Sequence, residues 1–219
     1  MESPRTPEKD PRALVTGCIL AGGLSRRMGG GDKSLKTLAG KPMLTHVIER
    51  LTPQVGAVVI NANGDPARFS AFGLPVQPDL VEDHAGPLAG VLAGLRWAAE
   101  HTPQAQYVAT AATDTPFFPA DLVARFVEAA EGKTRIVLAH SGDWTHPVFG
   151  LWPVALADDL ERAVREEGLR KVLVWVYGHD NTEVDFPIRT IGGQEIDPFF
   201  NANTPDELAL AERLVTEAA

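Results

Sequence analysis

Short apolar runs alternate with segments of helical periodicity along most of this chain, and this alternation restricts the possible folds more than any other feature. Apolar runs of this length between turn residues are typical of buried strands. They cover residues 13–20, 57–61, 107–112, 135–140 and 147–152. Between these runs, apolar residues recur at helical spacing in the ranges 43–51, 88–95 and 122–127. Each of these three segments is predicted to be a helix with one buried face.

Strands that alternate with amphipathic helices predict an α/β fold. We expect a Rossmann-like three-layer α/β/α sandwich with a mostly parallel sheet. Such sheets bind ligands at the carboxyl ends of their strands. Three segments directly follow predicted strands: the glycine-rich stretch 22–31, the sequence Asn61-Ala62-Asn63 and the turn at Asp114. We therefore expect these three segments to meet at one edge of the sheet.

The chain length of 219 residues and the 44% hydrophobic content suit a single domain, which we expect to cover residues 13–219. Residues 1–12 contain three prolines among mixed charges, so a disordered tail is expected there. Because no apolar run approaches the roughly 18 residues of a membrane span or forms a signal core, the sequence favours a cytoplasmic protein without a membrane partner.

The last third of the chain is less regular. Residues 154–165 have the spacing of a helix, whereas residues 171–177 are too uniformly apolar to be assigned as helix or strand. The sequence Thr204-Pro205-Asp206-Glu207 is a capping box with proline at the first helical position. It predicts a last helix that ends at about residue 216.

The charge of the chain is unevenly distributed. The formal net charge of −9 argues against broad nucleic-acid binding, because phosphate contacts dominate that affinity. Between residues 26 and 41, however, five basic residues stand against the single acid Asp32. They are Arg26, Arg27, Lys33, Lys36 and Lys41. This local reversal of sign is either a solvated basic loop or a site for a small anionic ligand.

One cysteine, Cys18, rules out an intramolecular disulfide and is expected to pack in a strand, because no activating base is adjacent. The glycine-rich stretch from Leu20 to Lys33 matches neither common glycine template. A P-loop requires a glycine directly before its lysine, where this chain has Asp32, and no Gly-x-Gly-x-x-Gly fingerprint fits. A phosphate-binding loop remains reasonable, since glycines let backbone N–H groups approach an anion closely.

Several motifs, taken in order, resemble one family. They are Leu20-Ala21-Gly22-Gly23, Ser25, Arg27-Met28-Gly29, Asp32-Lys33, Gly40-Lys41-Pro42, Asn61-Ala62-Asn63, Asp79, Gly86-Pro87-Leu88-Ala89-Gly90, Asp114-Thr115-Pro116, His146-Pro147 and Asn201-Ala202-Asn203-Thr204-Pro205. Together they span roughly residues 17 to 215 and resemble the molybdenum cofactor guanylyltransferases. The resemblance implies a nucleotidyltransferase fold of the glycosyltransferase-A-like type. It also implies transfer of GMP from GTP to molybdopterin, with release of pyrophosphate and dependence on Mg²⁺.

The resemblance also implies roles for individual residues. Leu20, Ala21, Gly22 and Gly23 would bind the nucleotide through the backbone, Lys33 its phosphates and Arg27 the leaving pyrophosphate. Asn61 and Asp79 would hold the base or the ribose, and Asp114 would bind Mg²⁺. The molybdopterin side is expected to include His146, Arg170, Lys171, Asn201 and Asn203.

Each of these residues also has an ordinary structural interpretation. Lys33 resembles a surface lysine, Asp114 a turn-capping aspartate and Asn203 a residue that shapes a helix entry. Functional roles are favoured for Lys33 because a point charge beside a glycine loop suits phosphate, and for Asp114 because Mg²⁺ prefers oxygen ligands. His146 and the other residues of the molybdopterin side are equally compatible with structural roles.

Two positions depart from the family pattern, and two other functions remain open. Thr113 stands where a cysteine often precedes the metal aspartate, and Gly31 extends the glycine run. A related transferase that uses CTP or ATP, acting on the same cofactor or on a sugar phosphate, is the first alternative. A non-catalytic nucleotide-binding module is the second. Partner proteins, if any, are expected to be other cofactor-biosynthesis proteins or molybdoenzyme chaperones in transient contact.

Overall fold

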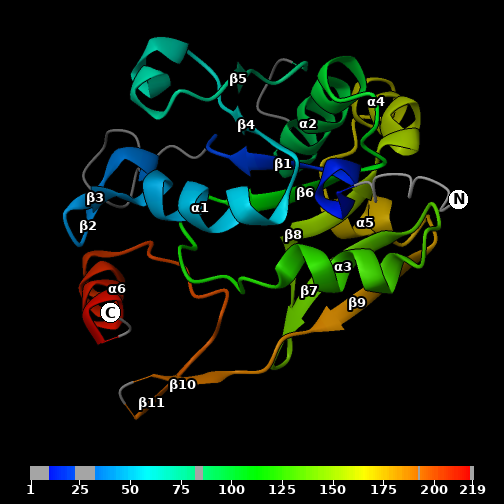
Figure 1. Cartoon of the computed structure of the whole chain (residues 1–219). Coiled ribbons are helices and arrows are strands. Elements are labelled where there is room, and N and C mark those ends of the chain that lie inside the picture. The colour runs from blue at the N-terminus through cyan, green and yellow to red at the C-terminus, as the bar shows by residue number, and fades with distance from the viewer. Residues whose placement is uncertain (1–9, 23–32, 82–85, 192, 218–219) are drawn as a thin grey trace, which may run out of the picture.

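The centre of the molecule is a seven-stranded sheet with the order β5-β4-β1-β6-β8-β7-β9 (Figure 1). The computed structural model describes residues 10–22, 33–81, 86–191 and 193–217. Neighbouring strands pair in parallel except where β8 pairs with β6 and β7, so the expected mostly parallel sheet is confirmed. The strands are β1 (Val15–Leu20), β4 (Ala57–Asn61), β5 (Val76–Gln77), β6 (Tyr107–Ala112), β7 (Ile136–Ser141), β8 (Trp144–Pro153) and β9 (Asn181–Asp185).

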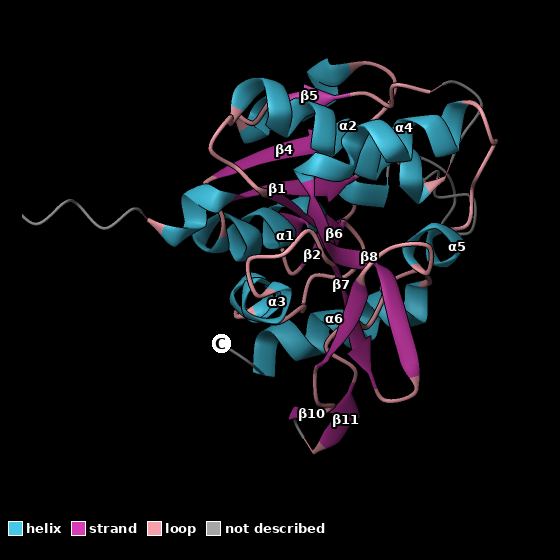
Figure 2. Ribbon diagram, turned by 90° about the vertical axis from the view of Figure 1, so that its right-hand side faces the viewer, coloured by secondary structure: helices cyan, strands magenta, loops and turns pink. Residues whose placement is uncertain are grey.

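Helices cover both faces of this sheet, which gives the three layers predicted from the sequence (Figures 1 and 2). The helices α1 (Met43–Leu51) and α3 (Leu122–Ala130) share one apolar core with the sheet. The helices α2 (Pro87–His101), α4 (Ala157–Arg165) and α5 (Val172–Val176) share the other. The predicted inward stripes are buried, for example Leu44 and Val47 in α1 and Leu88 and Leu92 in α2.

Cys18 lies within β1 and faces α2 across a very close contact. A Cβ atom added to Gly94 would be 2.9 Å from the sulfur of Cys18, so only glycine lets the helix approach the strand this closely. The thiol is fully buried, and burial raises the pKa of Cys18 to about 12. The predicted packing role of this cysteine is therefore confirmed.

Two small hairpins and the last helix lie outside the central sheet. The hairpin of β2 (Thr37–Leu38) and β3 (Lys41–Pro42) packs with α6 (Pro205–Glu217) through the buried residues Leu38, Met43, Ala202 and Ala211. The hairpin of β10 (Arg189–Ile191) and β11 (Gln194–Ile196) extends away from the body in both views (Figures 1 and 2). Short 3-10 helices are η1 (Pro11–Leu14), η3 (Lys33–Leu35), η4 (Thr52–Gln54), η5 (Pro66–Phe72) and η6 (Val154–Leu156).

Element boundaries differ from the predictions in a few places, each with a local cause. The expected strand at 13–20 starts at Val15, because Asp10 caps a short helix with Pro11 in its first turn. The expected boundary between tail and domain at residue 12 thus falls inside η1, while residues 1–9 lie outside the described part. The ambiguous run 171–177 contains the helix α5, and the strand expected at 147–152 starts earlier, at Trp144.

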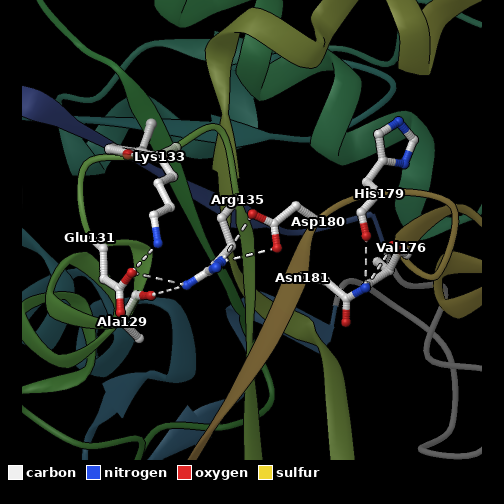
Figure 3. Close-up of polar contacts among 9 residues, drawn as sticks. Ala129, Glu131, Lys133, Arg135, Val176, His179, Asp180 and Asn181 are labelled. Carbon is white, nitrogen blue, oxygen red and sulfur yellow. Dashed lines mark hydrogen bonds and ion pairs between the residues drawn. The ribbon is translucent and has the colours of Figure 1, made fainter.

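At the amino end of β7, charged residues pair with one another (Figure 3). Arg135 donates to both carboxylate oxygens of Asp180, at 3.1 and 3.2 Å, and to the carbonyl of Ala129 at 3.4 Å. Glu131 lies 3.5 Å from the same guanidinium and also pairs with Lys133. We call these residues, Ala129, Glu131, Lys133, Arg135 and Asp180, the amino-edge network. It ties the end of α3 and the start of β9 to β7.

Candidate active site

A cavity of about 410 Å³ opens at the carboxyl edge of the sheet. The strands around it end in register, since Leu20 of β1 is aligned with Asn61 of β4 on one side and with Ala112 of β6 on the other. Asn61, Asn63 and Asp114 therefore lie at one edge with Gly22, as the sequence predicted, while residues 23–31 of the glycine-rich stretch lie outside the described part. The cavity is lined by Leu20, Gly22, Asn61, Asn63, Asp79, Gly86, Pro87, Gly90, Ala112, Thr113, Asp114, Val148 and Asn201.

Asp79 is held at one side of the cavity by two asparagines. The Asn61 amide donates to the carbonyl of Gln77 at 3.1 Å and to Oδ1 of Asp79 at 2.9 Å. The Asn63 amide donates to Oδ2 of Asp79 at 2.7 Å, and its own oxygen accepts the backbone N–H of Asp79 at 2.8 Å. Because an amide nitrogen can only donate and a carboxylate only accept, these contacts determine how both asparagines are oriented.

Two glycines allow the start of α2 to lie against this side of the cavity. A Cβ atom at Gly90 would be 2.5 Å from Oδ1 of Asn61 and 2.8 Å from a methyl carbon of Leu20. Gly86 has φ +72° and ψ −164°, a conformation that is practically restricted to glycine. Proline at the first position of α2 then begins the helix directly behind the cavity.

Asp114 lies at the opposite side, in the turn after β6. It is half-buried, and its backbone carbonyl accepts the N–H of Ala202 at 2.8 Å. The hydroxyl of the next residue, Thr115, donates to Oδ1 of Asn201 at 2.5 Å. These two contacts bring residues 201 and 202 from the far end of the chain to the turn at Asp114.

His146 does not line the cavity and instead belongs to a hydrogen-bonded chain beside it. Its Nε2 atom lies 2.7 Å from the hydroxyl of Ser141, which donates to the carboxylate of Asp197 at 2.8 and 2.9 Å. The imidazole also stacks on Phe199, with ring centroids 4.5 Å apart. Burial lowers the pKa of His146, partly offset by the nearby charge of Asp197. This chain anchors the segment that leads to Asn201.

The structure brings together most of the predicted nucleotide-side residues that it describes. Those that line the cavity are Leu20, Gly22, Asn61, Asp79 and Asp114, and Asn201, which was predicted for the molybdopterin side, lines it as well. Ala21 lies just behind them, and its N–H donates to the carbonyl of Asn61 at 2.8 Å. Gly23 and Arg27 fall outside the described residues, and Lys33 begins η3 with only its backbone described.

The remaining residues predicted for the molybdopterin side make structural contacts. Arg170 donates to the carbonyls of Val164 and Leu169, both at 3.0 Å. Lys171 is exposed at the start of α5. The backbone N–H of Asn203 donates to the carboxylate of Glu207 at 2.7 Å, within the predicted capping box of α6.

Three residues that line the cavity or contact residues around it received no individual role from the sequence: Asn63, Thr115 and Ser141. Asn63 belonged to the motif Asn61-Ala62-Asn63, and its position two residues after Asn61 at the end of a predicted strand was the available signal. Thr115 belonged to the motif Asp114-Thr115-Pro116, but nothing in the sequence linked Thr115 or Ser141 to their partners Asn201 and Asp197, which are 86 and 56 residues away in the chain. Contacts over such distances become visible only in the folded molecule.

Comparison with known proteins places the chain among nucleotidyltransferases. The family model of the MobA-like NTP transferase domain matches residues 17–181. Molybdenum cofactor guanylyltransferases from Bradyrhizobium sp. (strain ORS 278) and Rhodopseudomonas palustris (strain BisB5) are 53% and 49% identical to it. The aligned regions cover 91% and 90% of this chain, and 92% and 91% of those proteins, respectively.

The fold comparison agrees. The crystal structure of molybdopterin-guanine dinucleotide biosynthesis protein A from Archaeoglobus fulgidus aligns with a TM-score of 0.68 at 26% identity. The alignment covers 92% of this chain and 98% of that one. Sequence and fold thus point the same way, and the chain belongs to the MobA-like NTP transferase family, together with the molybdenum cofactor guanylyltransferases.

Proposed function

We propose that this protein transfers GMP from GTP to a molybdopterin-type cofactor, forming a guanine dinucleotide and releasing pyrophosphate. The observation that carries the proposal is the single cavity in which Asn61, Asp79 and Asp114 meet at the ends of parallel strands. Its volume, about 410 Å³, is within the usual range for small-molecule sites. The high identity to guanylyltransferases over nine-tenths of the chain supports GTP as the donor.

On one side of the cavity, Asn61 and Asp79 present oxygen acceptors to a ligand. The N1–H and exocyclic amine of guanine are donors, and so are the hydroxyls of ribose. We assign this side to the nucleoside part of GTP. On the glycine-rich side, Gly22 lines the cavity. From the family resemblance we assign Lys33 and Arg27 to the phosphates.

We assign Mg²⁺ to Asp114, and the donor set at this place fits that ion. The described residues contain no group of three or more histidine, cysteine, aspartate or glutamate side chains that could hold a metal. Magnesium does not require such a group, since it commonly takes one or two carboxylates and completes its octahedron with phosphates and water. When bound, the ion would stabilise negative charge on the reacting phosphates.

The chemistry then requires positioning more than acid–base help from the protein. A phosphate of the acceptor attacks the α-phosphorus of GTP, the new P–O bond forms and the bond to pyrophosphate breaks in line. The attacking phosphate is already ionised near neutral pH, so no general base is needed. Backbone N–H groups near Gly22 and the charge of Lys33 would hold the triphosphate for this step.

Residues 10–22, 33–81, 86–191 and 193–217 contain no helix long and apolar enough to cross a membrane. As expected from the sequence, we propose a cytoplasmic reaction. Transient contacts with other cofactor-biosynthesis proteins or molybdoenzyme chaperones would then pass the product on.

The direct test is pyrophosphate release measured with GTP, CTP and ATP in turn, each with molybdopterin and Mg²⁺. We expect release with GTP only, together with a guanine dinucleotide detected by mass spectrometry. Faster release with CTP or ATP would mean that the donor is wrong. Tight GTP binding without product under any condition would identify a nucleotide-binding module instead.

A further inference from the structure

Thr115 is a buried residue with a polar side chain pointed at the active site. Its exposed fraction is 0%, and it directly follows Asp114 in the chain. Its hydroxyl lies 2.5 Å from Oδ1 of Asn201 but 3.4 Å from Oδ1 of Asp114. Since a hydroxyl has one proton to donate, the much shorter contact takes it.

In the structure this hydrogen bond holds the oxygen of the Asn201 amide at Thr115. An asparagine side chain has an oxygen that accepts and an NH₂ group that donates, and the two can exchange places by rotation of the amide. With Oδ1 held by Thr115, the NH₂ group is the part of Asn201 left for a ligand. Asn201 is exposed and lines the cavity, so a ligand can reach it.

The backbone around this pair is held as well. Ala202 is fully buried against Leu38 and Met43, and its N–H donates to the carbonyl of Asp114. The position of residue 201 relative to the turn therefore does not depend on Thr115. What Thr115 adds is the direction in which the amide of Asn201 points.

On the opposite side of the cavity, an asparagine offers a hydrogen-bond acceptor instead of a donor. Both protons of the Asn61 amide are used by Gln77 and Asp79, so Asn61 offers a ligand only its oxygen. The oxygens of an ionised phosphate are acceptors, and the carboxylate of Asp114 attracts them only through the Mg²⁺ assigned to it. An amide NH₂ group next to Asp114 is the donor that a phosphate needs at this place.

We propose that Thr115 is a positioning residue that keeps the NH₂ group of Asn201 turned towards a substrate phosphate beside Asp114. The inference deepens the proposed function and rests on it for the identity of the substrate. The phosphate belongs either to GTP or to the acceptor. Thr115 acts only through Asn201 and touches no substrate itself.

The test compares Thr115→Val, which keeps the shape but removes the hydroxyl, with Thr115→Ser, which keeps the hydroxyl. Both are made in the full chain, alone and combined with Asn201→Ala. We expect Thr115→Val to lower kcat/KM about tenfold, the usual effect of one misplaced hydrogen-bond partner, and Thr115→Ser to stay near the wild type. In the Asn201→Ala background, Thr115→Val should change nothing further, because its effect passes through the missing amide.

The Michaelis constants identify the source of the phosphate. A rise in KM for GTP assigns the contact to the triphosphate, and a rise in KM for molybdopterin assigns it to the acceptor. Three results would each overturn the inference. They are an unchanged kcat/KM in Thr115→Val, the same loss of kcat/KM from Thr115→Val in the wild-type and Asn201→Ala backgrounds, and a kcat/KM for Thr115→Ser as low as that of Thr115→Val. Thermal unfolding of every variant separates these outcomes from loss of the fold.

A second readout does not depend on turnover. The side-chain amide signals of Asn201, identified by their loss in Asn201→Ala, are followed by NMR as GTP or inorganic phosphate is added. We expect a shift in the wild type and in Thr115→Ser that is reduced in Thr115→Val. No shift with either ligand in the wild type would overturn the inference. A shift without guanine dinucleotide formation would support it while the proposed function fails.

Discussion

The two edges of the central sheet use similar residues in opposite ways. At the amino end of β7, Arg135 and Asp180 pair with each other in the amino-edge network (Figure 3). At the carboxyl edge, Asn61, Asp79 and Asp114 line one cavity. Polar residues at strand ends therefore do not by themselves mark a site. The difference is that at the carboxyl edge three strand ends bring such residues together around one cavity.

The difference between the two edges is tested most directly by removing one carboxylate from each edge. Asp114→Ala should lower kcat by about 10² to 10³, a loss typical of removing one group that stabilises charge in the transition state. GTP binding should weaken much less, because Asn61 and Asp79 remain. Turnover is measured as pyrophosphate release at saturating GTP, and binding by calorimetry.

Asp180→Ala is the matched control, since among the described residues this carboxylate pairs with Arg135 of the amino-edge network. We expect its kcat to equal that of the wild type. Normal turnover in Asp114→Ala would show that the carboxyl edge is not the catalytic one.

The close approach of α2 offers a second test, because two of its glycines face different neighbours. Gly90→Ala would place a methyl 2.5 Å from the Asn61 oxygen, whereas Gly94→Ala would place one 2.9 Å from the Cys18 sulfur. Each should destabilise the fold by roughly 1–3 kcal/mol through overpacking. Only Gly90→Ala should also weaken GTP binding, by about tenfold or 1.4 kcal/mol, because it displaces a cavity residue. Equal GTP affinity in the two variants would contradict the assignment of Asn61.

A weaker effect is expected at the amino edge. Arg135→Ala removes the hydrogen bonds to Asp180 and Ala129 and should lower the free energy of unfolding by about 1 kcal/mol, the upper range for partly exposed ion pairs. Lys133→Ala, which removes only the pairing with Glu131, should cost less. Urea unfolding measures both. A fall in kcat for Arg135→Ala would mean that the two edges are coupled.

The smallest effect concerns pH. Burial lowers the pKa of His146 below its ordinary value of 6.5, so the folded protein binds this proton less readily than the unfolded chain. The contribution of neutral His146 to the free energy of unfolding is therefore fully present above about pH 6.5. It falls as the pH drops below that value, with a slope of at most about 1.4 kcal/mol per pH unit for one proton.

His146→Gln should flatten this part of the pH–stability curve, measured by urea unfolding between pH 5 and 8. The groups that face the imidazole are Ser141, Asp197 and His140. Because His140 is also titratable, His140→Gln is the control and should leave the slope largely in place. An unchanged slope in His146→Gln would show that another group carries the pH dependence.

The sequence predicted the parts of this molecule that apolar patterns specify. The strands at 57–61 and 107–112 have the predicted bounds, and the meeting of three strand ends followed from parallel topology alone. Asn61, Asp79 and Asp114 were placed in one site because the motifs of a known family fell in order along the chain. Their roles stay predictions, as do those of Gly23, Arg27 and Lys33.

The elements that escaped prediction are short or polar. The edge strand β9 has only partly buried and exposed residues without regular alternation, and β5 has two residues, so neither gives a clear periodic signal. The contacts of Thr115 with Asn201 and of Ser141 with Asp197 join distant parts of the chain. Such pairs depend on tertiary packing, which no local pattern encodes.

The only cysteine of the chain, Cys18, lies behind α2 with its sulfur directed at the carbonyl of Gly90, 3.8 Å away. A thiol so deeply enclosed, and so weakly acidic, cannot exchange with sulfur atoms of a ligand or react with an alkylating reagent while the fold is intact. Labelling of this one position therefore follows opening of the helix from the sheet. The labelling rate of Cys18 therefore measures how often α2 separates from the sheet.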